Sequence, residues 1–108
     1  MEEFFVYPPV WILEVRSGDR VGCMTARTKL GKYVFVFTDL DLAERFLAAT
    51  GQADCKAIEV PSARAYLDFL EKQQAGCDRV AYDPPFKKPM RTTMPISRVI
   101  EDVRKRCE

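Results

Sequence analysis

The chain has 108 residues, of which 47% are hydrophobic and 31% charged, and its formal net charge is +1. This length and composition indicate one folded domain over residues 1–108. They exclude a largely disordered chain and a protein drawn to nucleic acid or membrane by its overall charge. Because the chain has no histidine, catalysis by Ser-His-Asp or Cys-His arrangements is excluded as well.

Three apolar segments joined by short turns predict an antiparallel meander of strands over residues 10–16, 21–26 and 33–37. Pro8-Pro9 separate the first strand from residues 4–7, which we expect to be an edge strand or a covering arm. The second strand is less apolar and contains the small residues Gly22 and Ala26. The third is apolar on both faces, which places it in the interior of the sheet.

A unit of strand, helix cap, amphipathic helix and glycine then occurs twice, over residues 33–51 and 56–76. Thr38 or Asp39 caps the first helix and Ser62 caps the second. A short fifth strand follows at 79–82. Strand–helix–strand connections are right-handed, so a sheet that grows in one direction carries both helices on one face.

Residues 83–95 contain four prolines and are expected to form an extended linker to a last helix. The apolar residues of that helix have helical spacing: Ile96, Val99, Ile100 and Val103. This stripe docks either on the chain's own sheet or on a partner. Overall, the pattern predicts a single α+β domain. It has a mixed five-stranded sheet, built from the N-terminal antiparallel meander and two strand–helix–strand units, with about three helices mainly on one face.

The four cysteines lack the Cys-x-x-Cys spacing of a zinc site: Cys23, Cys55, Cys77 and Cys107. The acidic N-terminus lacks the features of a secretory signal, and no apolar run approaches the roughly 20 residues that span a membrane. We therefore expect a cytoplasmic protein with reduced thiols, without metal, cofactor or membrane contact. Cys55 and Cys77 are expected in loops with exposed thiols.

An apolar strand entering Phe37-Thr38, a helix with Ala43 and Phe46, a helix with Tyr66-Leu67, and a short strand ending at Asp83-Pro84 follow one another over about residues 33–85. This order resembles the N-terminal domain of the SseB-like proteins, a bacterial family. Asp83 stands where the family has asparagine, and residues 86–107 have no counterpart in it. The resemblance implies a small cytoplasmic domain without enzymatic activity, and it assigns no functional residue.

Candidate binding residues lie near both ends of the chain. Three are aromatic side chains of the N-terminal segment, which form an interface if their sheet face is bare and core if it is covered: Phe5, Tyr7 and Trp11. Five belong to the proline-rich basic segment, which is either a binding segment of limited freedom or a tether to the last helix: Tyr82, Phe86, Lys87, Lys88 and Arg91.

Since no catalytic arrangement is present, the sequence predicts a non-catalytic intracellular protein-interaction module. Its partner is another protein or a second copy of the chain, bound through the aromatic N-terminal strand as a homodimer. The alternative is a nucleic-acid-associated protein that uses residues 82–106, where basic residues are concentrated. A third hypothesis is a small enzyme or thiol sensor that uses Cys55 or Cys77.

Overall fold

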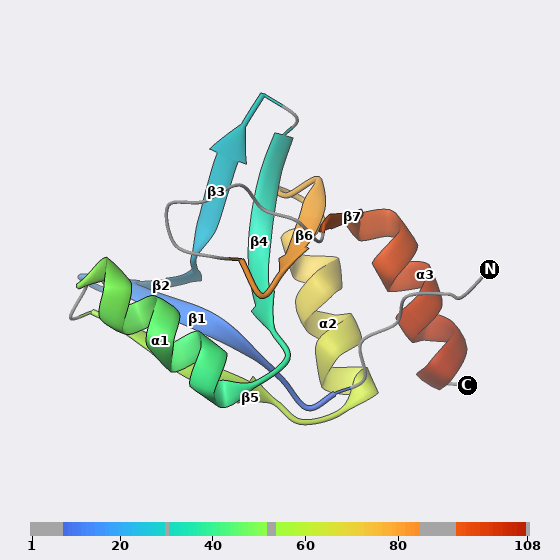
Figure 1. Ribbon diagram of the computed structural model, residues 1–108. Helices are drawn as coiled ribbons and strands as arrows, with labels where there is room; N and C mark the ends of the chain where they lie inside the picture. Colours follow the sequence, from blue (N-terminus) through green and yellow to red (C-terminus); the bar gives the residue numbers. More distant parts are fainter. Residues whose placement is uncertain (1–7, 30, 52–53, 85–92, 108) are drawn as a thin grey trace.

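The computed structural model describes residues 8–29, 31–51, 54–84 and 93–107 (Figure 1). Within these ranges the chain forms seven strands and three helices that share one mixed sheet. In chain order the elements are β1 (Val10–Ser17), β2 (Arg20–Cys23), β3 (Thr25–Thr28), β4 (Gly31–Phe37), α1 (Leu40–Thr50), β5 (Cys55–Val60), α2 (Ala63–Gln73), β6 (Arg79–Tyr82), β7 (Thr93–Pro95) and α3 (Ile96–Cys107). The α+β class is therefore confirmed.

The prediction of five strands was wrong on two counts. The expected second strand bends at Met24 and becomes two strands, of which β2 pairs with β1 and β3 pairs with β4. The end of the expected linker forms β7, a short strand antiparallel to β6. The rest of that linker, residues 85–92, lies outside the described residues, as does the expected arm at 4–7.

The sheet divides where β1 and β4 separate. These strands pair directly only at Trp11 and Ile12, opposite Phe37 and Val36. Beyond that point β1 continues between β5 and β2, while β4 continues between β3 and β6. The bent β2–β3 segment consequently lines the angle between the two halves of the sheet (Figure 1).

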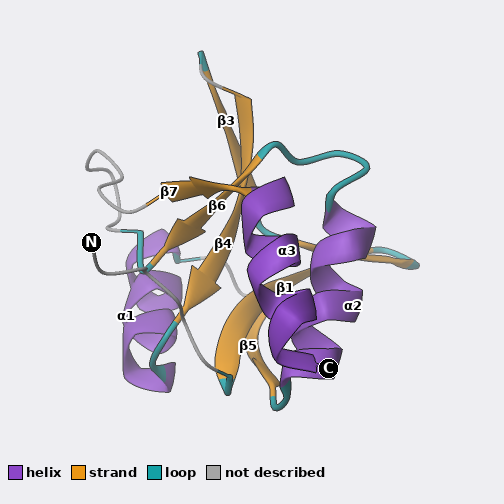
Figure 2. Cartoon of the chain, turned by 90° about the vertical axis from the view of Figure 1, so that its right-hand side faces the viewer, coloured by secondary structure: helices purple, strands orange, loops and turns teal. Residues whose placement is uncertain are grey.

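Both faces of the sheet carry a hydrophobic core, because alternate side chains of a strand point to opposite faces. In β4, Val34 and Val36 pack with residues of α2 and α3, whereas Tyr33, Phe35 and Phe37 pack with residues of α1. Figure 2 shows α1 on one side of the sheet and the other two helices across from it. Two of the three helices, α2 and α3, therefore share a face, but the expectation that α1 and α2 lie on the same face was wrong.

The reason is the order of the strands. The strands follow the order β5, β1, β4, β6 across the sheet. The connection through α1 runs from β4 over β1 to β5, whereas the connection through α2 runs the opposite way, from β5 over β1 and β4 to β6. Two right-handed connections that run in opposite directions place their helices on opposite faces.

Local sequence accounts for the helix ends. The Asp39 carboxylate accepts a hydrogen bond from the backbone N–H of Asp41 at 2.7 Å, and the Ser62 hydroxyl accepts one from the N–H of Ala65 at 3.2 Å. Gly51 ends α1 in the left-handed conformation, with φ +68°. In contrast, α2 ends at Gln73, three residues before the glycine expected to close it.

The apolar stripe of α3 docks within the chain. Its four stripe residues are all buried, in contact with residues of α2 and β6: Ile96, Val99, Ile100 and Val103. Of the two alternatives for this helix, docking within the chain is therefore the one observed. None of the described helices is both long enough and apolar enough to cross a membrane.

Candidate functional site

The predicted binding residues that the structure describes are largely enclosed. Trp11 is half-buried in β1 and packs on the α1 side of the sheet. Tyr82 is only 5% exposed, and its hydroxyl lies 2.7 Å from the hydroxyl of Tyr66. The other six fall outside the described residues: Phe5, Tyr7, Phe86, Lys87, Lys88 and Arg91. Of the two described residues, Trp11 packs on the α1 side of the sheet and Tyr82 in the α2–α3 core, so these two do not share a surface.

The nucleic-acid alternative finds little support in the described part of residues 82–106. Because Tyr82 is buried, its ring presents no face on which a base can stack. On α3, the Arg104 guanidinium lies 3.1 Å from the Glu71 carboxylate, and the Lys105 ammonium lies 3.7 Å from that of Glu101. These acidic partners offset part of the positive charge of the helix.

Three of the four cysteines have a thiol pKa raised by burial, namely Cys23, Cys55 and Cys77. Cys77 does lie in the loop after α2, but it is buried, and Cys55 is the half-buried first residue of β5, so their expected exposure was wrong. Burial raises the pKa of both thiols, and it raises the pKa of Cys23 to about 11. Since the thiolate is the reactive form, these shifts oppose nucleophilic chemistry at neutral pH. None of the four cysteines is in a disulfide.

The described residues also hold no group of three or more Cys, Asp or Glu side chains placed to bind a metal ion. Asp39 and Asp41, which begin α1, are used locally. Asp39 caps the helix, and the Asp41 carboxylate lies 2.9 Å from the Arg45 guanidinium one turn later.

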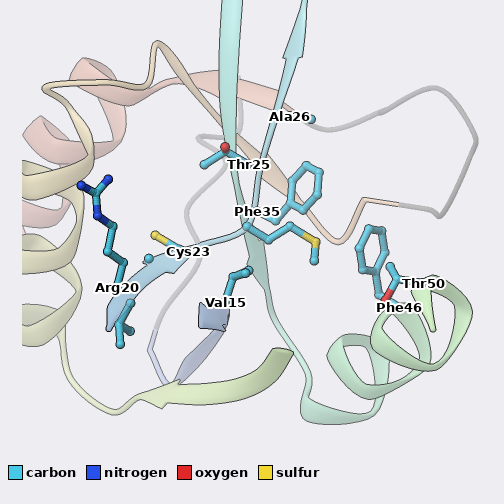
Figure 3. Close-up of a pocket in the computed structure, with 11 residues that line it drawn as sticks. Val15, Arg20, Cys23, Thr25, Ala26, Phe35, Phe46 and Thr50 are labelled. Carbon is cyan, nitrogen blue, oxygen red and sulfur yellow. The ribbon is translucent and has the colours of Figure 1, made fainter. Parts of the chain in front are cut away.

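A cavity of about 800 Å³ lies where the sheet divides, on the α1 side (Figure 3). One wall consists of residues 20–26, which cover all of β2, the bend at Met24 and the start of β3. The other contributions come from Val15, Phe35, Phe46 and Thr50. Figure 3 shows Arg20 toward one end and the α1 side chains toward the other. We call this cavity the edge groove.

The edge groove runs along the outer edge of β2, the edge that faces away from β1. The Met24 N–H donates to the Leu13 carbonyl at 2.8 Å, and the Phe35 N–H donates to the Met24 carbonyl at 3.4 Å, so Met24 joins β1 to β4. Backbone groups alternate in direction along a strand, so those of Val21 and Cys23 point away from β1. Among the described strands, β2 pairs only with β1 and β3 only with β4.

The lining is mainly apolar, and a missing side chain keeps it open. The ring centroids of Phe35 and Phe46 lie 5.4 Å apart in an edge-to-face arrangement behind the groove. Gly22 lies in the middle of β2, where an added Cβ would meet no atom within 4 Å. Val21 beside it is 58% exposed.

The charge along this edge is positive. Residues 20–29 contain Arg20, Arg27 and Lys29 and no acidic residue, although Asp19 precedes them in the hairpin turn. Arg16, on the neighbouring strand, is 63% exposed and lies 3.3 Å from the Glu14 carboxylate. The groove therefore combines an apolar wall, an unpaired backbone edge and a cationic border.

Sequence reasoning did not identify this site. Gly22 and Ala26 were the signal, since glycine inside a strand often marks the close approach of a ligand or of another backbone. The apolar residues of the groove, Phe35 and Phe46, were correctly expected to be buried, but nothing local to them indicates that a cavity adjoins them.

No family model matches this chain and no curated protein matches it. The similarity to SseB-like proteins therefore stays a prediction drawn from the residues alone.

Proposed function

We propose that the protein is a non-catalytic, cytoplasmic protein-interaction module and that the edge groove is its binding surface. The observation that carries this proposal is the coincidence of an open apolar cavity along residues 20–26 with the outer edge of β2, with which no described strand pairs. Exposed apolar surface next to unpaired backbone groups is the feature by which many sheets bind extended segments of other proteins.

The chemistry of the surrounding groups supports binding rather than catalysis. The thiol nearest the groove, Cys23, has its pKa raised to about 11 by burial. Among the described residues, the groove lining contains no carboxylate, whereas general acid–base catalysis most often uses histidine or carboxylates. Arg20 is the charged residue of this described lining, and it suits the recognition of an anionic group.

The test is a display library of fragments of natural proteins, selected on the purified chain. Enriched fragments are then measured as purified peptides against the parent protein and against Gly22→Trp, which fills the groove. We expect the substitution to weaken binding by about tenfold or more. Gly76→Trp is the matched control, because Gly76 also has open space around its Cβ position and lies outside the groove lining.

If no fragment binds the parent protein, or if Gly22→Trp binds every fragment as well as the parent does, the proposal fails. Circular dichroism of both tryptophan variants establishes that each is folded.

Self-association is the second form of the proposal, with the N-terminal aromatic residues as the contact. Light scattering after size exclusion tests it over a range of concentrations. A homodimer weakened by Trp11→Ser supports this form, whereas a monomer at all concentrations excludes it and leaves another protein as the partner.

A further inference from the structure

We infer that the edge groove binds an extended acidic peptide segment of a partner protein, which adds as a strand to the outer edge of β2. This inference rests on the proposed interaction function and specifies the chemistry of its partner. Three properties of the groove carry it, namely the direction of the unpaired backbone groups, the shape of the cavity and the sign of the charge.

The backbone geometry selects an extended partner. In the β1–β2 hairpin, Val15 pairs with Gly22 and Arg16 with Val21. The Arg16 N–H donates to the Asp54 carbonyl at 3.1 Å, on the β5 side, so Arg16 does not use its backbone groups on Val21. The N–H and carbonyl of Val21 therefore face outward, and those of Cys23 do too, two residues later. The backbone N–H and carbonyl groups of an added strand also point outward at every second residue, so they match those of Val21 and Cys23. A helix uses these backbone groups for its own internal hydrogen bonds.

The shape of the cavity selects β2 rather than β3. All four residues of β2 line the groove, but only Thr25 and Ala26 of β3 do so. The bend at Met24 also prevents one straight strand from pairing with both. At about 3.3 Å per residue, β2 accommodates a partner strand of about four residues.

The lining selects an apolar side chain at one position of the partner. Successive side chains of a strand point to opposite faces, so alternate partner residues face the α1 side of the sheet. There they meet the space above Gly22 and the wall formed by Phe35 and Phe46. A branched aliphatic side chain fills this space without displacing protein atoms.

The charge selects acidic neighbours for that side chain. Arg20 borders the groove, Arg27 lies in β3 and Lys29 directly after it, and no acidic residue lies among residues 20–29. Arg20 lies two residues from Gly22 and shares its face of the sheet. A carboxylate two residues from the apolar residue therefore pairs with Arg20 at the border of the groove, where part of the water is displaced. A basic peptide with the same apolar content meets like charge instead.

The probe for the test is a blocked seven-residue peptide in which valine and glutamate take turns at every second position and threonine stands between them, with a lysine-for-glutamate peptide as its matched control. We expect the glutamate peptide to bind and the lysine peptide to bind about tenfold more weakly or not at all. For Arg20→Glu this preference should reverse, because the charge at the border is then opposite. Calorimetry at two salt concentrations gives the affinities.

A second measurement tests strand addition itself. On binding, amide hydrogen exchange of Val21 and Cys23 should slow by about tenfold or more, while that of Gly22, already paired with β1, changes little. Val21→Pro removes an outward N–H without removing a bond to β1 and should weaken binding by about fivefold, whereas Val21→Thr, which keeps the N–H, should not.

The outcomes separate this inference from the function on which it rests. Groove-dependent fragments from the display selection that are helical or basic would overturn the acidic strand and leave the interaction function intact. A dimer abolished by Gly22→Trp would overturn it in favour of a second copy. Equal binding of the glutamate and lysine peptides would overturn the charge argument, and unchanged exchange at Val21 would overturn strand addition.

Discussion

At the scale of single residues, Asp83 shows how one side chain holds two strand ends together. It follows β6 with φ +48°, a left-handed conformation that non-glycine residues seldom adopt and that aspartate tolerates better than most. Its carboxylate accepts hydrogen bonds from the Thr38 N–H at 2.8 Å and the Thr38 hydroxyl at 2.7 Å. Asp83 therefore joins the end of β6 to the end of β4, and Thr38 serves this contact while Asp39 caps α1.

We predict that Asp83→Ala lowers the free energy of unfolding by roughly 2–3 kcal/mol, since it removes two bonds to a carboxylate and places alanine at a positive φ. Asp83→Asn should cost about 1 kcal/mol, because asparagine accepts the positive φ and retains one acceptor oxygen. Urea unfolding measures both changes. If alanine and asparagine were equally destabilising, the backbone conformation would contribute nothing at this position.

At the scale of elements, Asp78 connects three segments of the α2–α3 side. Its carboxylate accepts a hydrogen bond from the Lys32 N–H of β4 at 2.9 Å, and its own N–H donates to the Lys32 carbonyl at 2.8 Å. The Ile96 N–H at the start of α3 donates to the Asp78 carbonyl at 3.0 Å. This arrangement requires Gly31, where a Cβ would lie only 2.5 Å from the Asp78 carboxylate and φ is +132°.

We therefore predict that Gly31→Ala destabilises the fold by about 2 kcal/mol or more, through strain at this φ and displacement of the Asp78 carboxylate. Gly22→Ala is the matched control, because its Cβ meets nothing within 4 Å, and it should change stability by less than about 0.5 kcal/mol. Thermal and urea unfolding of the two variants give the comparison. Equal losses would mean that the contact with Asp78 does not constrain Gly31.

Elements were easier to predict than their arrangement, because element signals are local. Capping side chains and helical spacing placed all three helices, and apolar runs placed β1, β4, β5 and β6. Strand order depends on pairings distant in sequence, and the insertion of β1 between β4 and β5 reverses one connection. The pattern of residues 33–37, apolar on both faces, already required a cover on each side of that strand, which one layer of helices does not provide.

At the scale of the whole molecule, the proposed binding site lies where the regular fold is interrupted. Each face of the sheet is covered by helices, and the edge groove opens where the two halves of the sheet divide. No sequence pattern marks the edge groove. It results from the lack of a side chain at Gly22 and from outer edges of β2 and β3 with which no described strand pairs.

The hydrogen-bonded tyrosine pair of the α2–α3 core should control stability at alkaline pH. Burial raises the pKa of Tyr82 to about 12 and the pKa of Tyr66 well above 10, because an ionised phenol is poorly solvated in the core. The unfolded chain then releases these protons more readily than the folded one. Their contribution to stability is complete below about pH 10 and is lost as the pH rises toward 12 and beyond.

For Tyr82 alone this loss is on the order of 2 kcal/mol at pH 12. We predict that Tyr66→Phe/Tyr82→Phe, which removes both ionisable hydroxyls, loses less stability between pH 10 and 12 than the parent protein does. Urea unfolding at each pH, followed by the fluorescence of the single tryptophan, Trp11, gives the two curves. Lysine and cysteine ionisation is common to both proteins, so the difference between the curves isolates the tyrosines. Parallel curves would show that the buried pair ionises as readily in the fold as in the unfolded chain.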